Sequence, residues 1–199
     1  MSDEIKSALE IAMEKTEQLG EATEEERLKW KYSPQGEQMA ATYLKEDVNL
    51  IAELGKHPEM ARKYIAGGMA GVLIRNISLP KSDVIKKINK KAMDGLKLIK
   101  TDKVKVENVF SQIRRIFEHY VTQGEQQRKQ AYQALKNDLE SKMQQALQQQ
   151  MGVMAGGTPR IDVERHPQFQ QEWRRLQAQL DAQYGTLLNE YKEELSSIP

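Results

Sequence analysis

The strongest constraint on the fold is a long uninterrupted stretch in the second half of the chain. Residues 106–151 contain no proline and one glycine, Gly124. Apolar side chains recur there every three or four positions, which is the period of an α-helix, so the pattern predicts one very long helix. The apolar stripe weakens between Gly124 and Ala131, where glutamines predominate. That part of the helix is therefore expected either to bend or to meet a polar partner.

A second striped helix is predicted after His166-Pro167, because proline is well suited to the first helical position. The intervening residues 152–165 are rich in glycine and predict a turn. We expect residues 103–198 to form a long antiparallel helical hairpin that packs like a coiled coil. The apolar stripe of the second helix consists of Phe169, Trp173, Leu176, Leu180, Tyr184, Leu187, Tyr191, Leu195 and Ile198.

Shorter helices are predicted before this hairpin, in residues 1–100. The first is expected at residues 3–19, and Thr23 with Glu26 has the spacing of a capping box for the next. Ser33-Pro34 predicts a fresh helix start, with a candidate break near residue 47. The chain is 39% hydrophobic and 30% charged, a balance that favours exposed amphipathic helices over a compact α/β enzyme. The predicted fold class is all-α.

Three glycines lie inside the helix predicted after His57-Pro58. They are Gly67, Gly68 and Gly71, and a glycine inside a helix costs about 1 kcal/mol relative to alanine. Close approach of another helix is the expected compensation. A phosphate-binding loop is the alternative, but no strand precedes these glycines and no Gly-Lys-Ser/Thr follows them.

Charge is segregated along the chain. Residues 1–60 hold 14 Asp and Glu against 7 Lys and Arg, whereas residues 81–115 hold 4 Asp and Glu against 11 Lys and Arg. The favoured interpretation is that the two segments pair within one molecule or one oligomer.

A basic amphipathic helix is predicted at residues 82–100, with its lysines pointing away from an apolar face. Contact with a polyanion is the alternative explanation of this helix, and it makes a nucleic-acid-associated protein the alternative function. The sequence offers no evident set of residues for reading bases, and the apolar face is better suited to a core than to a membrane surface. The candidate polyanion contacts are Lys86, Lys87, Lys90, Lys91 and Lys97.

The aromatic stripe of the last helix is the candidate partner interface. Two helices alone cannot cover so many large side chains, so we expect further helices or a second copy of the chain to complete the burial. The candidate interface residues are Phe169, Trp173, Leu180, Tyr184 and Tyr191.

No catalytic, cofactor-binding or metal-ligating set is recognised in the sequence. The chain has no cysteine, and it contains no Glu-x-x-His, His-x3-His, Gly-x-Ser-x-Gly or Gly-x-Gly-x-x-Gly motif. The start lacks the features of a secretory signal, and no apolar stretch reaches the roughly 20 residues of a membrane span. We therefore expect a cytoplasmic, non-enzymatic scaffold or interaction module without a transmembrane segment. It is expected to self-associate or dock a protein partner through its C-terminal hairpin.

Overall fold

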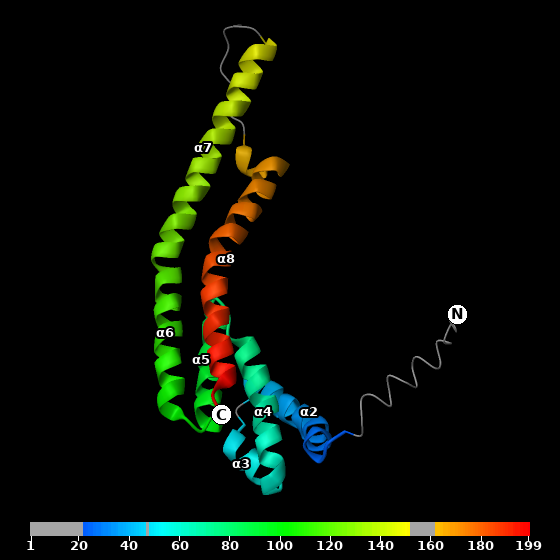
Figure 1. The fold of residues 1–199 in the computed structure, drawn as a ribbon. Helices are drawn as coiled ribbons and strands as arrows, with labels where there is room; N and C mark the ends of the chain where they lie inside the picture. The colour runs from blue at the N-terminus through cyan, green and yellow to red at the C-terminus, as the bar shows by residue number, and fades with distance from the viewer. Residues whose placement is uncertain (1–21, 47, 152–161) are drawn as a thin grey trace, which may run out of the picture. The chain divides into compact units, whose positions relative to one another are not determined.

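The computed structural model describes residues 22–46, 48–151 and 162–199, and all regular elements in these residues are helical (Figure 1). The predicted all-α class is therefore confirmed. The helix expected at residues 3–19 and most of the expected turn lie outside the described residues. The helices are α2 (Glu24–Lys45), α3 (Leu50–Gly55), α4 (Glu59–Asn76), α5 (Asp83–Ile99), α6 (Lys103–Val121), α7 (Gln123–Met151) and α8 (Pro167–Ser197), with a short 3-10 turn, η1 (Val163–Arg165).

Contacts divide the chain into two compact units, one ending at Val72 and the other beginning at Leu73. The boundary falls inside α4, so one helix contributes to both units. The predicted division into a cluster of short helices in residues 1–100 and a long hairpin in residues 103–198 stays a prediction.

Helix α2 begins with the predicted capping box. The Glu26 carboxylate accepts a hydrogen bond from the Thr23 backbone N–H at 2.9 Å, and the Thr23 hydroxyl accepts one from the Glu26 N–H at 3.3 Å. The helix start predicted at Ser33-Pro34 was wrong, because α2 runs through Pro34 without a break. Pro34 is exposed, so water can reach the Trp30 carbonyl that loses its helical partner. The tendency of Ser33-Pro34 to interrupt a helix is therefore outweighed by packing on the opposite side of α2.

That packing is a close crossing of α2 and α4. A methyl group at Gly68 would collide with the backbone carbonyl of Ser33, and a methyl group at Gly36 would collide with that of Ile65. Both glycines are needed because the two backbones touch at these points. The predicted close approach is thus confirmed for Gly68 but was wrong for the other two glycines of α4, around which nothing lies within 4 Å of an added side chain.

In the second unit, α8 lies beside α6 and α7 and runs in the opposite direction (Figure 1). At one end the Thr101 N–H donates to the Pro199 carbonyl at 2.9 Å. Further along, the ring centroids of Tyr132 and Phe169 are 5.2 Å apart. The arrangement is antiparallel. Because residues 152–161 lie outside the described part of the chain, the hairpin connection and its coiled-coil packing stay predictions.

The long helix predicted at residues 106–151 is interrupted once. Helix α6 ends at Val121 and α7 begins at Gln123, with Thr122 between them at φ −103° and ψ −82°. This interruption directly precedes the segment where the apolar stripe weakens. The sequence predicted either a bend or a polar partner for that segment, and the interruption at Thr122 places a bend directly before it.

Candidate functional site

The first two residues of the predicted partner interface, Phe169 and Trp173, pack inside the second unit. Phe169 is buried in a cluster with Leu139 and Val163, and Trp173 is half-buried against this cluster. The Tyr132 ring of α7 stands edge-on to both, with centroid distances of 5.2 Å to Phe169 and 5.1 Å to Trp173. These aromatic side chains therefore already serve as the core between α7 and α8.

The other residues of the predicted interface, Leu180, Tyr184 and Tyr191, are also buried or half-buried. Tyr184 is buried, its ring packs edge-on to Tyr120 at 5.2 Å, and its hydroxyl lies 2.9 Å from His119 Nδ1. Leu180 and Tyr191 are half-buried. One member of the wider stripe was misplaced by the sequence pattern, because Leu187 is 47% exposed while the neighbouring leucine is buried. Assembly through this stripe stays a prediction.

The lysines of the basic helix separate into two sets. Lys86, Lys90 and Lys97 line one hollow between α5 and α6, whereas Lys87 and Lys91 do not. Lys86 pairs with Asp83 at 2.8 Å. Among the described residues, Lys90 and Lys87 make no ion pair.

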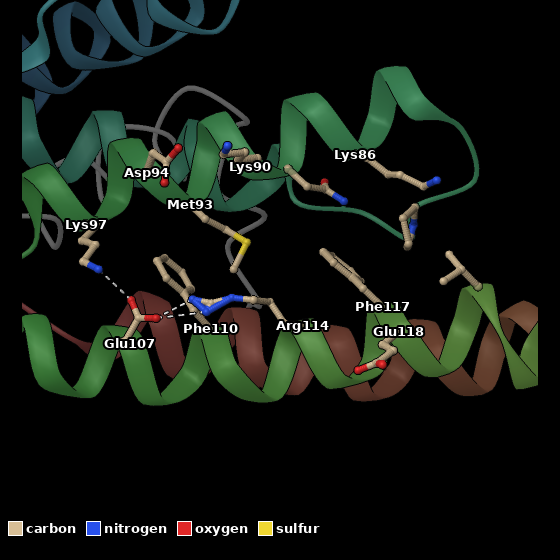
Figure 2. A pocket seen from close by; sticks show the side chains of 13 residues that line it. Lys86, Lys90, Met93, Asp94, Lys97, Glu107, Phe110, Arg114, Phe117 and Glu118 are labelled. Atoms are coloured by element: carbon tan, nitrogen blue, oxygen red, sulfur yellow. Dashed lines mark hydrogen bonds and ion pairs between the residues drawn. The ribbon is translucent and has the colours of Figure 1, made fainter.

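This hollow is an open groove of about 470 Å³ with an apolar floor. Figure 2 shows Phe110 and Phe117 reaching from α6 toward Met93 of α5, with charged side chains around them. Phe117 is half-buried, so part of its ring is accessible from the groove. The complete lining is Pro80, Lys86, Asn89, Lys90, Met93, Asp94, Lys97, Glu107, Phe110, Arg114, Phe117, Glu118 and Val121.

A buried asparagine fixes one wall of the groove. The Asn89 amide donates to the Ser78 carbonyl at 2.6 Å and accepts from the Ser78 N–H at 2.9 Å. These two bonds replace the backbone partners that the loop before α5 lacks. They tie that loop to α5 and thereby hold Pro80 at the edge of the groove.

One end of the groove carries a charge cluster. Glu107 accepts hydrogen bonds from Lys97 at 3.0 Å and from Arg114 at 3.0 Å (Figure 2). The hydrogen bond from Lys97, aided by the charge of Arg114, holds the pKa of Glu107 below its usual value. Since one carboxylate serves two cations, the cluster keeps a net positive charge.

A second hollow of about 660 Å³ adjoins the first. The two share Pro80, Lys86 and Val121, so they form one continuous surface depression. The second hollow lies where α6 gives way to α7, and α8 forms its other wall. Its remaining lining is Lys81, Tyr120, Glu125, Arg128, Arg174, Gln177, Ala178 and Asp181.

A polar network stabilises this second hollow. Asp181 accepts a hydrogen bond from the Tyr120 hydroxyl at 3.0 Å and pairs with Lys81 at 2.6 Å. Arg128 donates to the Tyr120 carbonyl at 3.1 Å and stacks on its ring at 4.2 Å. Burial, together with the hydrogen bond to Asp181, raises the pKa of Tyr120 to about 12. The last turn of α6 is thus capped by a residue of α7.

One donor of that network has no acceptor. Within the described parts of the chain, Arg128 Nη1 is buried without a hydrogen-bond partner, and the Asp181 carboxylate lies 3.8 Å from it. Sequence reasoning missed this network, because its members are about 60 residues apart and are joined only when α8 packs on α6. The glutamine-rich gap in the stripe was the sole sequence signal near it.

Comparison with known protein families gives a match for this chain. Residues 51–197 match a family of unknown function, DUF6657. The chain belongs to this family. The region matched includes α4 to α8, and therefore every residue that lines the two hollows. Neither a curated protein nor a solved structure shows a significant match.

The described residues were also compared with two general kinds of site. They contain no group of three or more His, Cys, Asp or Glu residues placed to hold a metal ion. Of the helices described, none combines the length and the apolar character needed to cross a membrane.

Proposed function

We propose that this protein is a non-enzymatic helical interaction module that docks a protein segment in the groove between α5 and α6. The observation that supports the proposal is the apolar floor of Met93, Phe110 and Phe117 at the base of an open groove. Grooves between helices that expose apolar and aromatic side chains are a common way to bind a partner helix. Helix α6 belongs to the predicted hairpin, but this groove is a different site from the aromatic stripe of α8 for which the sequence predicted docking.

Nucleic-acid binding is the weaker proposal for the same basic surface. The groove lining contains three carboxylates, Asp94, Glu107 and Glu118, beside its cationic side chains. A phosphate backbone binds through many cations and would leave the apolar floor of the groove without a contact. A protein segment with both apolar and charged side chains fits the mixed lining better.

Photo-crosslinking tests the proposal. A photoreactive phenylalanine analogue replaces Phe117 in the full chain, and the control carries it at Leu187, an exposed apolar position on α8. We expect a discrete adduct with a protein at position 117 and no such adduct at position 187. Equal, diffuse adducts at both positions would contradict docking in the groove.

Light scattering coupled to size exclusion identifies whether the docked segment belongs to a second copy. A mass that is a multiple of 22.9 kDa at both low and high salt supports self-association through apolar surfaces. A monomer that still gives the adduct at position 117 indicates a different protein as the partner.

A further inference from the structure

We propose that the groove and the adjoining hollow together bind an acidic amphipathic helix of a partner protein. This inference rests on the proposed function and specifies the chemistry of the docked segment. Its basis is the order of surfaces along the depression: an apolar groove, then a hollow rich in cations, with Lys86 at the junction.

The apolar half of the depression specifies the face of the partner that inserts. Phe117 is half-buried and offers aromatic surface to the groove, whereas Met93 and Phe110 lie buried at its base, and none of the three has a hydrogen-bonding group. Methionine adapts its shape to different apolar side chains, so leucine-like residues spaced at three and four positions fit this floor. A purely polar or extended acidic tail would leave the floor exposed to water.

The charges specify the other face. The second hollow has four cationic side chains, from Lys81, Lys86, Arg128 and Arg174, against two carboxylates, from Glu125 and Asp181. Along the sequence, residues 81–115 carry 11 Lys and Arg against 4 Asp and Glu, and five of these cations line the two hollows: Lys81, Lys86, Lys90, Lys97 and Arg114. Such a surface attracts an acidic partner over a distance of about 8 to 10 Å at physiological salt.

The ion pairs within the protein indicate which charged groups remain available to a partner. Asp181 and Glu107 are already neutralised by their own cations, so they do not offer a binding site to a basic partner. Lys90 makes no ion pair with any described residue, so its ammonium group can donate to a partner carboxylate without breaking an existing ion pair.

The test uses the full chain and a synthetic peptide probe. The probe is an 18-residue fluorescein-labelled helix with leucine at every third or fourth position and glutamate at the exposed positions. A second peptide carries glutamine in place of every glutamate. Fluorescence anisotropy measures the affinity of each at 50 mM and 500 mM salt, and we expect saturable binding of the acidic peptide that weakens as salt rises.

Matched variants locate the binding. Lys90→Glu and Arg174→Glu change side chains that line the depression, whereas Lys87→Glu makes the same charge change on α5 outside it. We expect the first two to weaken binding by about tenfold or more and the control to weaken it by about twofold or less. Phe117→Ala tests the apolar floor, and circular dichroism verifies that each variant is folded.

Three results overturn the inference: no binding of the acidic peptide, equal binding of the glutamine peptide, or equal loss for Lys87→Glu and Lys90→Glu. Salt-sensitive binding to phosphatidylserine vesicles or to a DNA duplex, without peptide binding, assigns the basic surface to another class of partner and also overturns it. If a specific adduct forms at position 117 and any of these results is also obtained, the proposed docking of a protein segment is still supported. Only the inference that this segment is an acidic helix is then rejected.

Discussion

Two neighbouring glycines of α4 are predicted to respond in opposite ways to the same substitution. Gly67→Ala places a methyl group where nothing lies within 4 Å, whereas Gly68→Ala drives one into the backbone carbonyl of Ser33. Both positions are inside the same helix, so the change in helix propensity is nearly the same for both. The difference between the two variants therefore isolates the cost of the close crossing of α2 and α4.

The magnitudes follow from two separate effects. Replacing glycine by alanine inside a helix stabilises the fold by about 1 kcal/mol, so Gly67→Ala is expected to raise the free energy of unfolding by that amount. Overpacking typically costs about 1 to 3 kcal/mol, and a backbone carbonyl cannot move aside as a flexible side chain can. Gly68→Ala is therefore expected to lower the free energy of unfolding by up to about 2 kcal/mol relative to the parent protein.

Urea unfolding followed by circular dichroism at 222 nm measures the free energy for both variants and the parent. Hydrogen exchange of the α2 amides and of the α4 amides up to Val72 assigns the change to the first unit, since the second unit also contributes helical signal. Gly36→Ala, which collides with the Ile65 carbonyl, serves as the reciprocal check from α2. Equal stabilisation by Gly67→Ala and Gly68→Ala would refute the close crossing.

Three further predictions concern the second unit. Tyr120 loses its proton near pH 12 in the folded chain and near pH 10 in the unfolded chain. Its contribution to the free energy of unfolding is therefore complete below pH 10, and about 3 kcal/mol of it is lost between pH 10 and 12. Absorbance at 295 nm should show a tyrosine step near pH 12, and Tyr120→Phe should abolish this step. Tyr184→Phe removes the hydrogen bond with His119 and should lower the free energy of unfolding in urea by about 1 kcal/mol, while an unchanged midpoint would count against the contact. Trp173→Ala should reduce any oligomer mass seen by light scattering, and an unchanged mass and stability would show that this side chain is not an interface anchor.

Local chemistry allowed several helix starts to be predicted from the sequence. Thr23 with Glu26, Ser82 and His166 each begin a helix where expected, because a capping side chain satisfies N–H groups of its own first turn. Ser33-Pro34 looked equally local, and the prediction failed there. The carbonyl of Ser33 packs on Gly68, and no pattern within α2 reveals a contact that α4 supplies.

The candidate site was only partly predictable for the same reason. The lysines of α5 were recognised from their spacing, but the groove needs Phe110 and Phe117 from α6 beside them. In the sequence these two residues read simply as part of an apolar stripe. The network of Tyr120, Arg128 and Asp181 joins three helices, so its geometry depends on a packing register that helical periodicity does not determine.

The tie between Thr101 and Pro199 also bears on how the protein is made. The contact closes a loop between residues 98 positions apart, at the turn that precedes α6. A ribosome that has just completed α6 at Val121 must add the rest of the chain through Ser197 before α8 is whole. At about 5 to 20 residues per second this takes on the order of 4 to 15 seconds. Until α8 is complete, the face of α6 that carries Tyr120 has no α8 to cover it, so a face that is buried in the folded protein stays uncovered during synthesis.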